Sequence, residues 1–144
     1  MASVATVDTT VLYAAANRSA SRHESALSIV RAADHGTLPI LHVPDVVLVE
    51  TMNGLTRDVG HATATDFLQR LRAGTQFNIA REPMAVWERG IQLFEEVDRL
   101  SLADALIVAG ARHHGRDDLH SFGADFDGFD GFCRLDSTID PFAP

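Results

Sequence analysis

The sequence predicts an α/β fold in three layers, with a mostly parallel central sheet between helices. Short apolar runs such as Val4–Val7 and Leu38–Val43 alternate with longer stretches whose apolar residues recur at helical spacing. Strands that alternate with helices in this way are typical of parallel sheets covered on both faces. The 144 residues are 46% hydrophobic and 22% charged, which suits one folded domain spanning residues 1–144.

The boundaries of the elements follow from apolar periodicity and from the capping residues. The first strand is an apolar run, and the helices after it are bounded by Gly, Pro, Ser and Asp. Strands are expected at residues 4–7, 38–43, 76–80, 119–122 and 132–135. Helices are expected at residues 11–17, 21–35, from 44 to before 60, 61–73, from 83 past 95, and from 101 to 113 or 114.

Individual residues support these boundaries. Gly36 suits the position after a helix end, and Pro44 suits the first turn of a helix. Ser101 is expected to cap the last helix. In the helix that Pro83 opens, Trp87, Ile91 and Phe94 recur at helical spacing and are expected to face the core.

Composition excludes several functions. The net charge is −8, and all twelve basic residues are arginines. Walker-type phosphate loops, receiver domains and haloacid-dehalogenase-like phosphatases all rely on a lysine, so none of them fits. Cys133 is the only cysteine, which excludes an internal disulfide and a cysteine-rich zinc site. We expect a core thiol there, in a cytoplasmic protein without a signal peptide, a membrane span or a membrane partner.

Four acidic residues stand beside apolar runs: Asp8, Glu50, Asp104 and Asp125. Carboxylates are rarely fully buried unless they are paired or bound to a cation. Ligands of open parallel sheets gather at the carboxyl ends of the strands, where Asp8 and Asp125 are expected. One cleft could therefore collect all four acids, and a divalent ion would relieve their repulsion. This pattern predicts a site for a hard metal ion.

Each acid also has a purely structural interpretation. Asp8 suits a helix N-cap, and Asp104 follows Ser101 at the spacing of a capping box. Glu50 lies in an apolar stretch, where Arg57 could be its structural partner. Taken singly, these interpretations compete with the metal site.

Two further groups of side chains favour structural roles. His113 and His114 are adjacent, so on a helix they face different directions, and a solvated helix end explains them better than a metal site. Four aromatic residues crowd near the end of the chain and are expected mainly to anchor the core, with base stacking as the alternative: Phe122, Phe126, Phe129 and Phe132.

Taken together, the strings around the four acids resemble those of PIN-domain ribonucleases, most closely the VapC toxins of type II toxin–antitoxin systems. The matching strings are residues 7–12, Glu50, residues 100–107 and residues 121–126. The resemblance implies a PIN-like α/β/α sandwich and a Mg²⁺- or Mn²⁺-dependent endoribonuclease. It makes Asp8, Glu50 and Asp104 the principal metal ligands and catalytic residues, with Asp125 as the fourth. It also implies an RNA substrate, a VapB-like antitoxin and a homodimer.

The sequence departs from the family pattern at the fourth acid. Many relatives read Thr-x-Asp-x-Asp-Phe, whereas Gly123 stands here in place of the earlier Asp and only Asp125 remains. Asp127 and Asp130 are nearby but are expected to be solvated. One alternative is therefore a degenerate PIN-like domain that binds RNA or a protein without cleavage. Another is a PIN nuclease of RNA processing.

Overall fold

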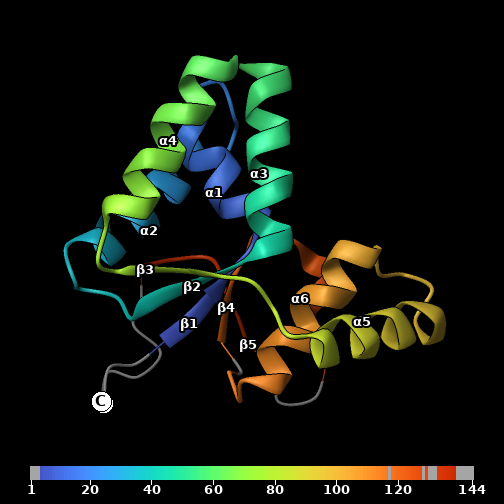
Figure 1. Cartoon of the computed structure of the whole chain (residues 1–144). Coiled ribbons are helices and arrows are strands. Elements are labelled where there is room, and N and C mark those ends of the chain that lie inside the picture. Colours follow the sequence, from blue (N-terminus) through green and yellow to red (C-terminus); the bar gives the residue numbers. More distant parts are fainter. Residues whose placement is uncertain (1–3, 117, 128, 130–132, 139–144) are drawn as a thin grey trace.

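The alternation of strands and helices is confirmed by the computed structural model, which describes residues 4–116, 118–127, 129 and 133–138 (Figure 1). The strands are β1 (Val4–Val7), β2 (Ile40–Pro44), β3 (Phe77–Ala80), β4 (Asp118–His120) and β5 (Cys133–Leu135). The helices are α1 (Thr9–Ala16), α2 (His23–Asp34), α3 (Asp45–Asp58), α4 (His61–Ala73), α5 (Met84–Glu96) and α6 (Leu102–His113), with a 3₁₀ turn η1 (Ala124–Phe126).

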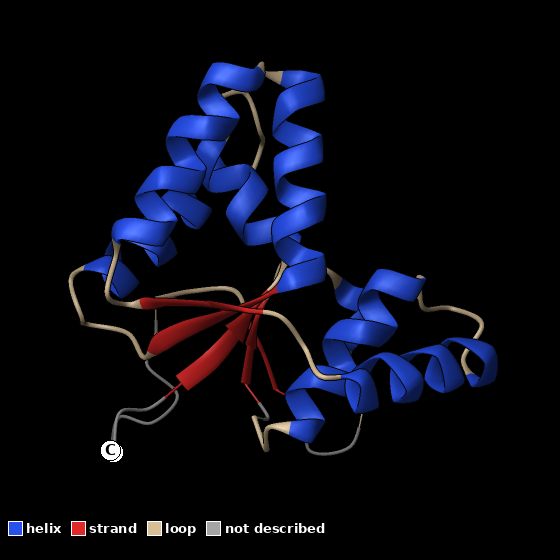
Figure 2. Ribbon diagram, viewed as in Figure 1, coloured by secondary structure: helices blue, strands red, loops and turns tan. Residues whose placement is uncertain are grey.

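The described residues form a five-stranded sheet in the order β3-β2-β1-β4-β5. Every neighbouring pair is parallel. The chain moves from β1 to β3 in one direction and then crosses to β4 on the other side of β1. Right-handed crossovers therefore put α1–α4 on one face and α5 and α6 on the other, as Figure 2 shows. The predicted three-layer α/β fold is confirmed.

The sheet is buried on both faces, which explains the apolar runs of its strands. Ala5 and Val7 in β1, Leu41 and Val43 in β2, and Leu119 in β4 are fully buried. Burying a Val or Leu side chain stabilises a fold by about 1.5–3 kcal/mol. Continuous apolar strands are typical of parallel sheets between two helical layers.

Several boundaries differ from the expected ones for local reasons. α1 begins at Thr9, two residues early, because the side chain of Asp8 accepts a hydrogen bond from the amide of Thr10 and caps the helix. Pro44 is the last residue of β2 and the N-cap of α3, so it precedes the helix. β4 ends at His120, before the chain turns toward η1. Residue 132, expected to begin the last strand, lies outside the described residues.

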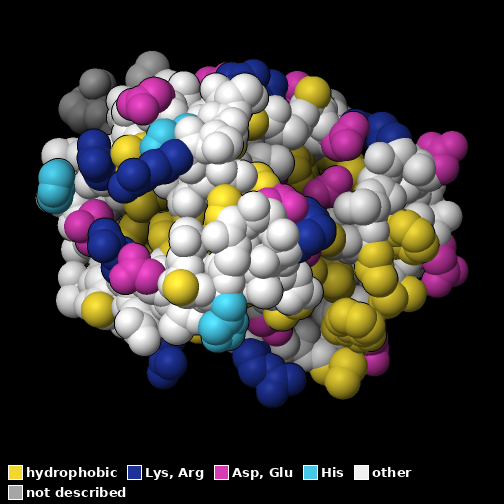
Figure 3. Space-filling view, turned by 90° about the horizontal axis from the view of Figure 1, so that it is seen from above, with side chains coloured by type: hydrophobic (Ala, Val, Ile, Leu, Met, Phe, Trp, Pro, Cys, Tyr) yellow, Lys and Arg dark blue, Asp and Glu magenta, His cyan; other side chains and the backbone are white. Residues whose placement is uncertain are grey.

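The prediction of which side chains of α5 face the core is wrong, because the buried positions lie one residue earlier in the sequence than the predicted ones. Trp87 is 51% exposed and Phe94 is 44% exposed, and exposed hydrophobic side chains gather toward one edge of the face in Figure 3. The buried residues of α5 are instead Val86, Gly90 and Leu93. A Cβ at Gly90 would lie 2.5 Å from a side-chain carbon of Leu106, so glycine allows α5 and α6 to approach closely.

Two expectations drawn from composition have different outcomes. Cys133 is exposed, so the prediction of a core thiol is wrong. Its strand, β5, is the last strand of the sheet that the described residues form. In the part of the chain that the structure describes, no helix is long and apolar enough to cross a membrane.

Candidate metal centre

The carboxyl ends of β1 and β4 meet where the strand order of the sheet reverses. The two strands pair in parallel, and the amide of Asp8 donates to the carbonyl of His120 at 3.1 Å. Asp8 follows β1 directly, and Ser121 follows β4 directly. Ligands of open α/β sheets bind in the crevice at this kind of switch point.

Asp8 is a buried carboxylate held by three hydrogen bonds. Its residue is only 2% exposed. Oδ1 accepts from the amide of Thr10 at 3.0 Å and from its hydroxyl at 2.6 Å, while Oδ2 accepts from the hydroxyl of Ser121 at 2.7 Å. Burial raises the pKa of Asp8 to about 6, against these hydrogen bonds, and the charge of Asp104 raises it further. The side chain is fixed in place, although its charged form is costly there.

Asp104 lies in the first turn of α6 and is half-buried. Its amide donates to the hydroxyl of the N-cap Ser101 at 3.1 Å, so the predicted capping contact is present. Burial raises the pKa of Asp104, Ser101 lowers it, and the charges of Glu50 and Asp125 raise it. Capping therefore coexists with electrostatic contact between this carboxylate and the other acids.

Glu50 lies on α3 and is exposed. Its Oε1 accepts a hydrogen bond from the hydroxyl of Thr9 at 2.8 Å, which links α3 to the start of α1. The structural partner proposed for it, Arg57, instead pairs with Asp58 at 2.9 Å. Glu50 is therefore an exposed acid directed toward the end of β1.

Asp125 lies in η1 and its residue is exposed. Nη1 of Arg99 donates to the backbone carbonyl of Asp125 at 2.8 Å and to that of Asp127 at 3.1 Å. The carboxylate of Asp127 pairs with Arg134 at 2.9 Å. Residue 130, the other loop acid, lies outside the described residues. The backbone around Asp125 is thus fastened by an arginine while its side chain faces solvent.

The four acids form one electrostatic group with Asp104 at its centre. Its charge acts on Asp8, and the charges of Glu50 and Asp125 act on it. Among the described residues, no arginine or histidine forms an ion pair with any of the four. The charge of Asp8 acts on Arg134, although the two form no ion pair. An all-oxygen set of four acids with so little compensating charge fits a hard divalent cation.

The acids do not form a tight cluster of ligand atoms. No three of these carboxylates, among the residues described, have oxygens that all lie within 4.8 Å of one another. Mg²⁺ keeps several of its waters and is usually bound by only one or two carboxylates directly. Direct binding of an ion by three of these acids at once would therefore require their side chains to move closer together.

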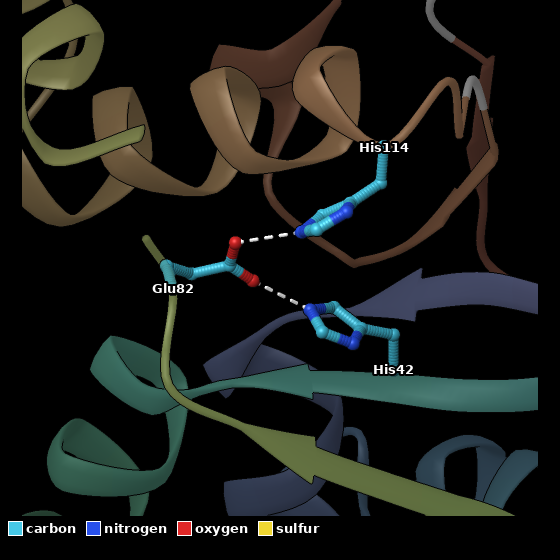
Figure 4. Close-up of side chains that lie close together, drawn as sticks. All are labelled: His42, Glu82 and His114. Atoms are coloured by element: carbon cyan, nitrogen blue, oxygen red, sulfur yellow. Dashed lines mark hydrogen bonds and ion pairs between the residues drawn. The ribbon is translucent and has the colours of Figure 1, made fainter. Parts of the chain in front are cut away.

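A second group of titratable side chains was missed in the sequence. Nε2 of His42 lies 2.6 Å from Oε1 of Glu82, and Nε2 of His114 lies 2.8 Å from Oε2 of the same carboxylate (Figure 4). The rings of the two adjacent histidines contact each other edge to face, with centroids 5.0 Å apart. The expectation that His114 is merely solvated is wrong, because it bonds to Glu82. The available signal was His42 itself, a titratable residue inside a buried apolar strand.

The aromatic cluster near the end of the chain is partly core and partly stacked against arginines. Phe126 is buried, and the guanidinium groups of Arg99 and Arg112 lie 4.8 Å and 5.3 Å from the ring centroid of Phe129. Arg22 stacks on Phe122 in the same way, at 5.1 Å. The fourth member, residue 132, lies outside the described residues.

Comparison with known proteins places this fold and sequence among characterised relatives. The profile of the PIN domain matches residues 5–131. Mycobacterium tuberculosis VapC20, described as a sarcin–ricin loop cleaving toxin, is 26% identical with a TM-score of 0.74, over 88% of this chain and 96% of that one. A toxin–antitoxin complex from Klebsiella pneumoniae contains a chain that is 26% identical with a TM-score of 0.62, over 94% and 98% of the two chains.

A more distant structure shares the fold alone. VapBC2 from Rickettsia felis, bound to a DNA fragment from its promoter, is 13% identical with a TM-score of 0.69, over 92% of this chain and 97% of that one. A search of curated protein sequences gives no match.

Proposed function

Because the chain belongs to the PIN-domain family, we propose that it is a Mg²⁺- or Mn²⁺-dependent endoribonuclease and the toxin of a toxin–antitoxin pair. PIN domains form a family of nucleases that typically use a divalent metal, and the fold is that of the VapC toxins. The similarity to a toxin described as cleaving the sarcin–ricin loop supports RNA as the substrate class.

The observation that carries the proposal is the environment of Asp8. A carboxylate that is 2% exposed, with a pKa raised to about 6, lies at the strand switch point beside a second acid whose pKa is also raised. A purely structural N-cap needs no such burial of charge, and an exposed capping Asp would serve. Raised pKa values at a crevice are typical of functional sites.

The residues of the chain would act mainly by position. Asp8 and Asp104 would hold the ion. The hydroxyl of Ser121 orients the carboxylate of Asp8, and the cap at Ser101 fixes the backbone of Asp104. Glu50 would complete the set from α3, oriented by the hydroxyl of Thr9. When bound, Mg²⁺ or Mn²⁺ lowers the pKa of a coordinated water and stabilises negative charge on the phosphoryl oxygens.

Asp125 would orient the attacking water and accept its proton. Its carboxylate is exposed, so it is not committed to a partner as Asp8 is, and Arg99 fixes its backbone. A general base must lie within hydrogen-bond reach of the water that it activates. Hydrolysis of the RNA phosphodiester then needs only a positioned water, a positioned phosphate and stabilised charge.

The proposed toxin function also predicts partners for the protein. We expect a VapB-like antitoxin that covers the acids, in which a basic side chain inserted among them would compensate their charge. We also expect a cytoplasmic homodimer. Structures of the similar Klebsiella pneumoniae toxin–antitoxin complex support the first expectation.

Induced expression with mapping of RNA 5′ ends tests the proposal. Wild-type protein is expected to create new 5′ ends at defined positions, and co-expression of the neighbouring antitoxin gene is expected to suppress them. Asp98→Asn, in an exposed acid outside the four, is the matched control for Asp104→Asn. New ends that persist in Asp8→Asn and Asp104→Asn would contradict the assignment of the site.

A second candidate function is favoured by Gly123. With glycine there, the site lacks the acid that many relatives carry, and a PIN-like domain that binds RNA or a partner without cutting becomes the alternative. Titration with Mn²⁺ separates the two functions, because a non-catalytic module should show no binding that depends on the carboxylates. A nuclease of RNA processing, in turn, would lack a short antitoxin gene overlapping its own.

A further inference from the structure

We propose that His42, Glu82 and His114 form a second metal site, which binds a transition-metal ion such as Zn²⁺. Among the described residues, these three are the group of His, Cys, Asp or Glu side chains whose donor atoms all lie within 4.8 Å of one another. They come from three separate segments: β2, the connection between β3 and α5, and the residue after α6. Figure 4 shows the imidazole of His114 above that of His42, each directed at a different oxygen of the Glu82 carboxylate.

The donor set selects the class of ion. Two imidazole nitrogens and one carboxylate suit Zn²⁺ and its neighbours in the transition series, whereas Mg²⁺ and Mn²⁺ prefer oxygen. Two His and one Glu, with a fourth position left for water, is a known open zinc arrangement. The site therefore differs in chemistry from the all-oxygen group around Asp8.

The distances require only a small adjustment for coordination. The two contacts to Glu82 are 2.6 Å and 2.8 Å, while ligands about 2.1 Å from a tetrahedral ion lie about 3.4 Å apart. The imidazoles would therefore separate from the carboxylate by roughly 0.6–0.8 Å. His114 can make its part of this movement because its side chain is 30% exposed. The separation of His42 from Glu82 needs a shift between two buried side chains, which are 4% and 8% exposed.

Without an ion, the burial of His42 and Glu82 has a free-energy cost. Burial lowers the pKa of His42 and thereby favours the neutral ring. Nδ1 of this ring is buried and has no hydrogen-bond partner among the residues that the structure describes. Burial also raises the pKa of Glu82, but the hydrogen bonds from the two histidines outweigh it and keep the carboxylate ionised. A neutral imidazole on His42 beside an ionised carboxylate on Glu82 is the combination of protonation states that a metal ion requires.

The surroundings preorganise Glu82. Its amide donates to Oδ2 of Asp45 at 3.2 Å. On the other side, a Cβ at Gly110 would lie 3.4 Å from its carboxyl carbon, so glycine in α6 lets the carboxylate lie against the helix. Arg116 contributes a positive charge nearby that opposes a cation and lowers the pKa of His42. The ionised Glu82 is therefore essential to the site.

The ion would act as a structural clamp. It would tie β2 and the β3–α5 connection to the end of α6, whose first turn carries Asp104. His114 lies ten positions after Asp104, a distance of about 15 Å along the axis of a helix. Binding at one end of α6 would therefore hold the helix that positions the proposed nuclease site at the other end, without contributing a ligand to it.

Zn²⁺ titration of the purified full chain tests the proposal, with calorimetry and thermal unfolding as readouts. All proteins carry Cys133→Ser, because an exposed thiol also binds Zn²⁺. The background protein is expected to bind one Zn²⁺ and to unfold at a higher temperature with it. His114→Ala is expected to weaken binding by at least 10–100-fold. His113→Ala removes the adjacent exposed imidazole and should have no effect.

Further variants and a spectroscopic readout keep the test decisive. Asp104→Asn should retain Zn²⁺ binding, which separates this site from the acidic one. In NMR spectra of the rings, Zn²⁺ should convert His42 and His114 to the tautomer protonated on Nδ1. Absence of Zn²⁺ binding, equal losses in His113→Ala and His114→Ala, or loss in Asp104→Asn alone would each overturn the proposal. These outcomes do not depend on whether the protein cleaves RNA.

Discussion

Replacing Asp8 with Asn should stabilise the metal-free protein at neutral pH. The carboxylate is buried, and its charged form is disfavoured despite three hydrogen bonds. Asn keeps the shape and can still accept from Thr10. It can also donate to Ser121, whose hydroxyl has a further acceptor site. The substitution therefore removes the buried charge and leaves the cap in place.

The magnitude follows from the pKa. A folded-state value of about 6 against an ordinary 3.8 corresponds to about 3 kcal/mol, at about 1.4 kcal/mol per pKa unit. Because the folded state binds this proton more tightly, the cost is present above pH ~6 and disappears as the pH falls through 6 toward 3.8. The gain from Asp8→Asn should therefore be about 1–3 kcal/mol at pH 7 and close to zero below pH ~4.

Urea unfolding of the wild type and Asp8→Asn from pH 4 to pH 8, in the presence of a chelator, measures this difference. Other acids titrate in both proteins, so the difference isolates Asp8. Adding Mn²⁺ should stabilise only the wild type and reduce the advantage of the variant. A variant that is less stable than the wild type at pH 7, or a difference in stability that does not change with pH, would contradict a destabilising buried charge at Asp8.

Three further predictions concern the same site. Ser121→Ala removes a 2.7 Å hydrogen bond to Asp8 worth about 1.5–3 kcal/mol, so the acid limb of the pH–rate profile should move up by about 1–2 units; Ser28→Ala, on the surface of α2, is the control. Gly123→Asp should raise the Mn²⁺ affinity about tenfold, whereas Gly123→Asn should not, as measured by calorimetry. The backbone allows a side chain there, because φ is −86° and the nearest atom to an added Cβ would be Oγ of Ser121 at 3.4 Å. Equal effects of both variants would exclude a role for charge. Mn²⁺ affinity of the wild type should fall about tenfold per pH unit below pH ~6, and a pH-independent affinity would exclude Asp8 as a ligand.

The sequence predicted those parts of the fold that depend on local patterns. Val4–Val7 and the helix at residues 61–73 match the structure residue for residue, because apolar periodicity and glycine boundaries determine them. The N-cap at Ser101 could also be predicted from the sequence, because the capping contact joins residues only three positions apart. Asp8 and Asp104 could be predicted as site residues because each follows or opens such an element, and their roles stay predictions.

Contacts over long sequence separations could not be predicted. His42 meets Glu82 across 40 residues because β2 pairs with β3. His114 meets Glu82 across 32 residues because the end of α6 lies against the β3–α5 connection. The error in α5 has a similar cause. Positions 87, 91 and 94 share helical spacing with 86, 90 and 93, and the choice between them depends on how closely Gly90 lets Leu106 approach.

The most direct test of the account is Mn²⁺-dependent cleavage of RNA by the purified protein, measured together with Mn²⁺ binding in Asp104→Asn and Asp98→Asn. A chelator should abolish the cleavage, and Mn²⁺ should restore it. Asp104→Asn should lose both Mn²⁺ binding and cleavage by about 100-fold or more, while Asp98→Asn should keep both. Undiminished Mn²⁺ binding and cleavage in Asp104→Asn would contradict the claim that these carboxylates hold the catalytic metal.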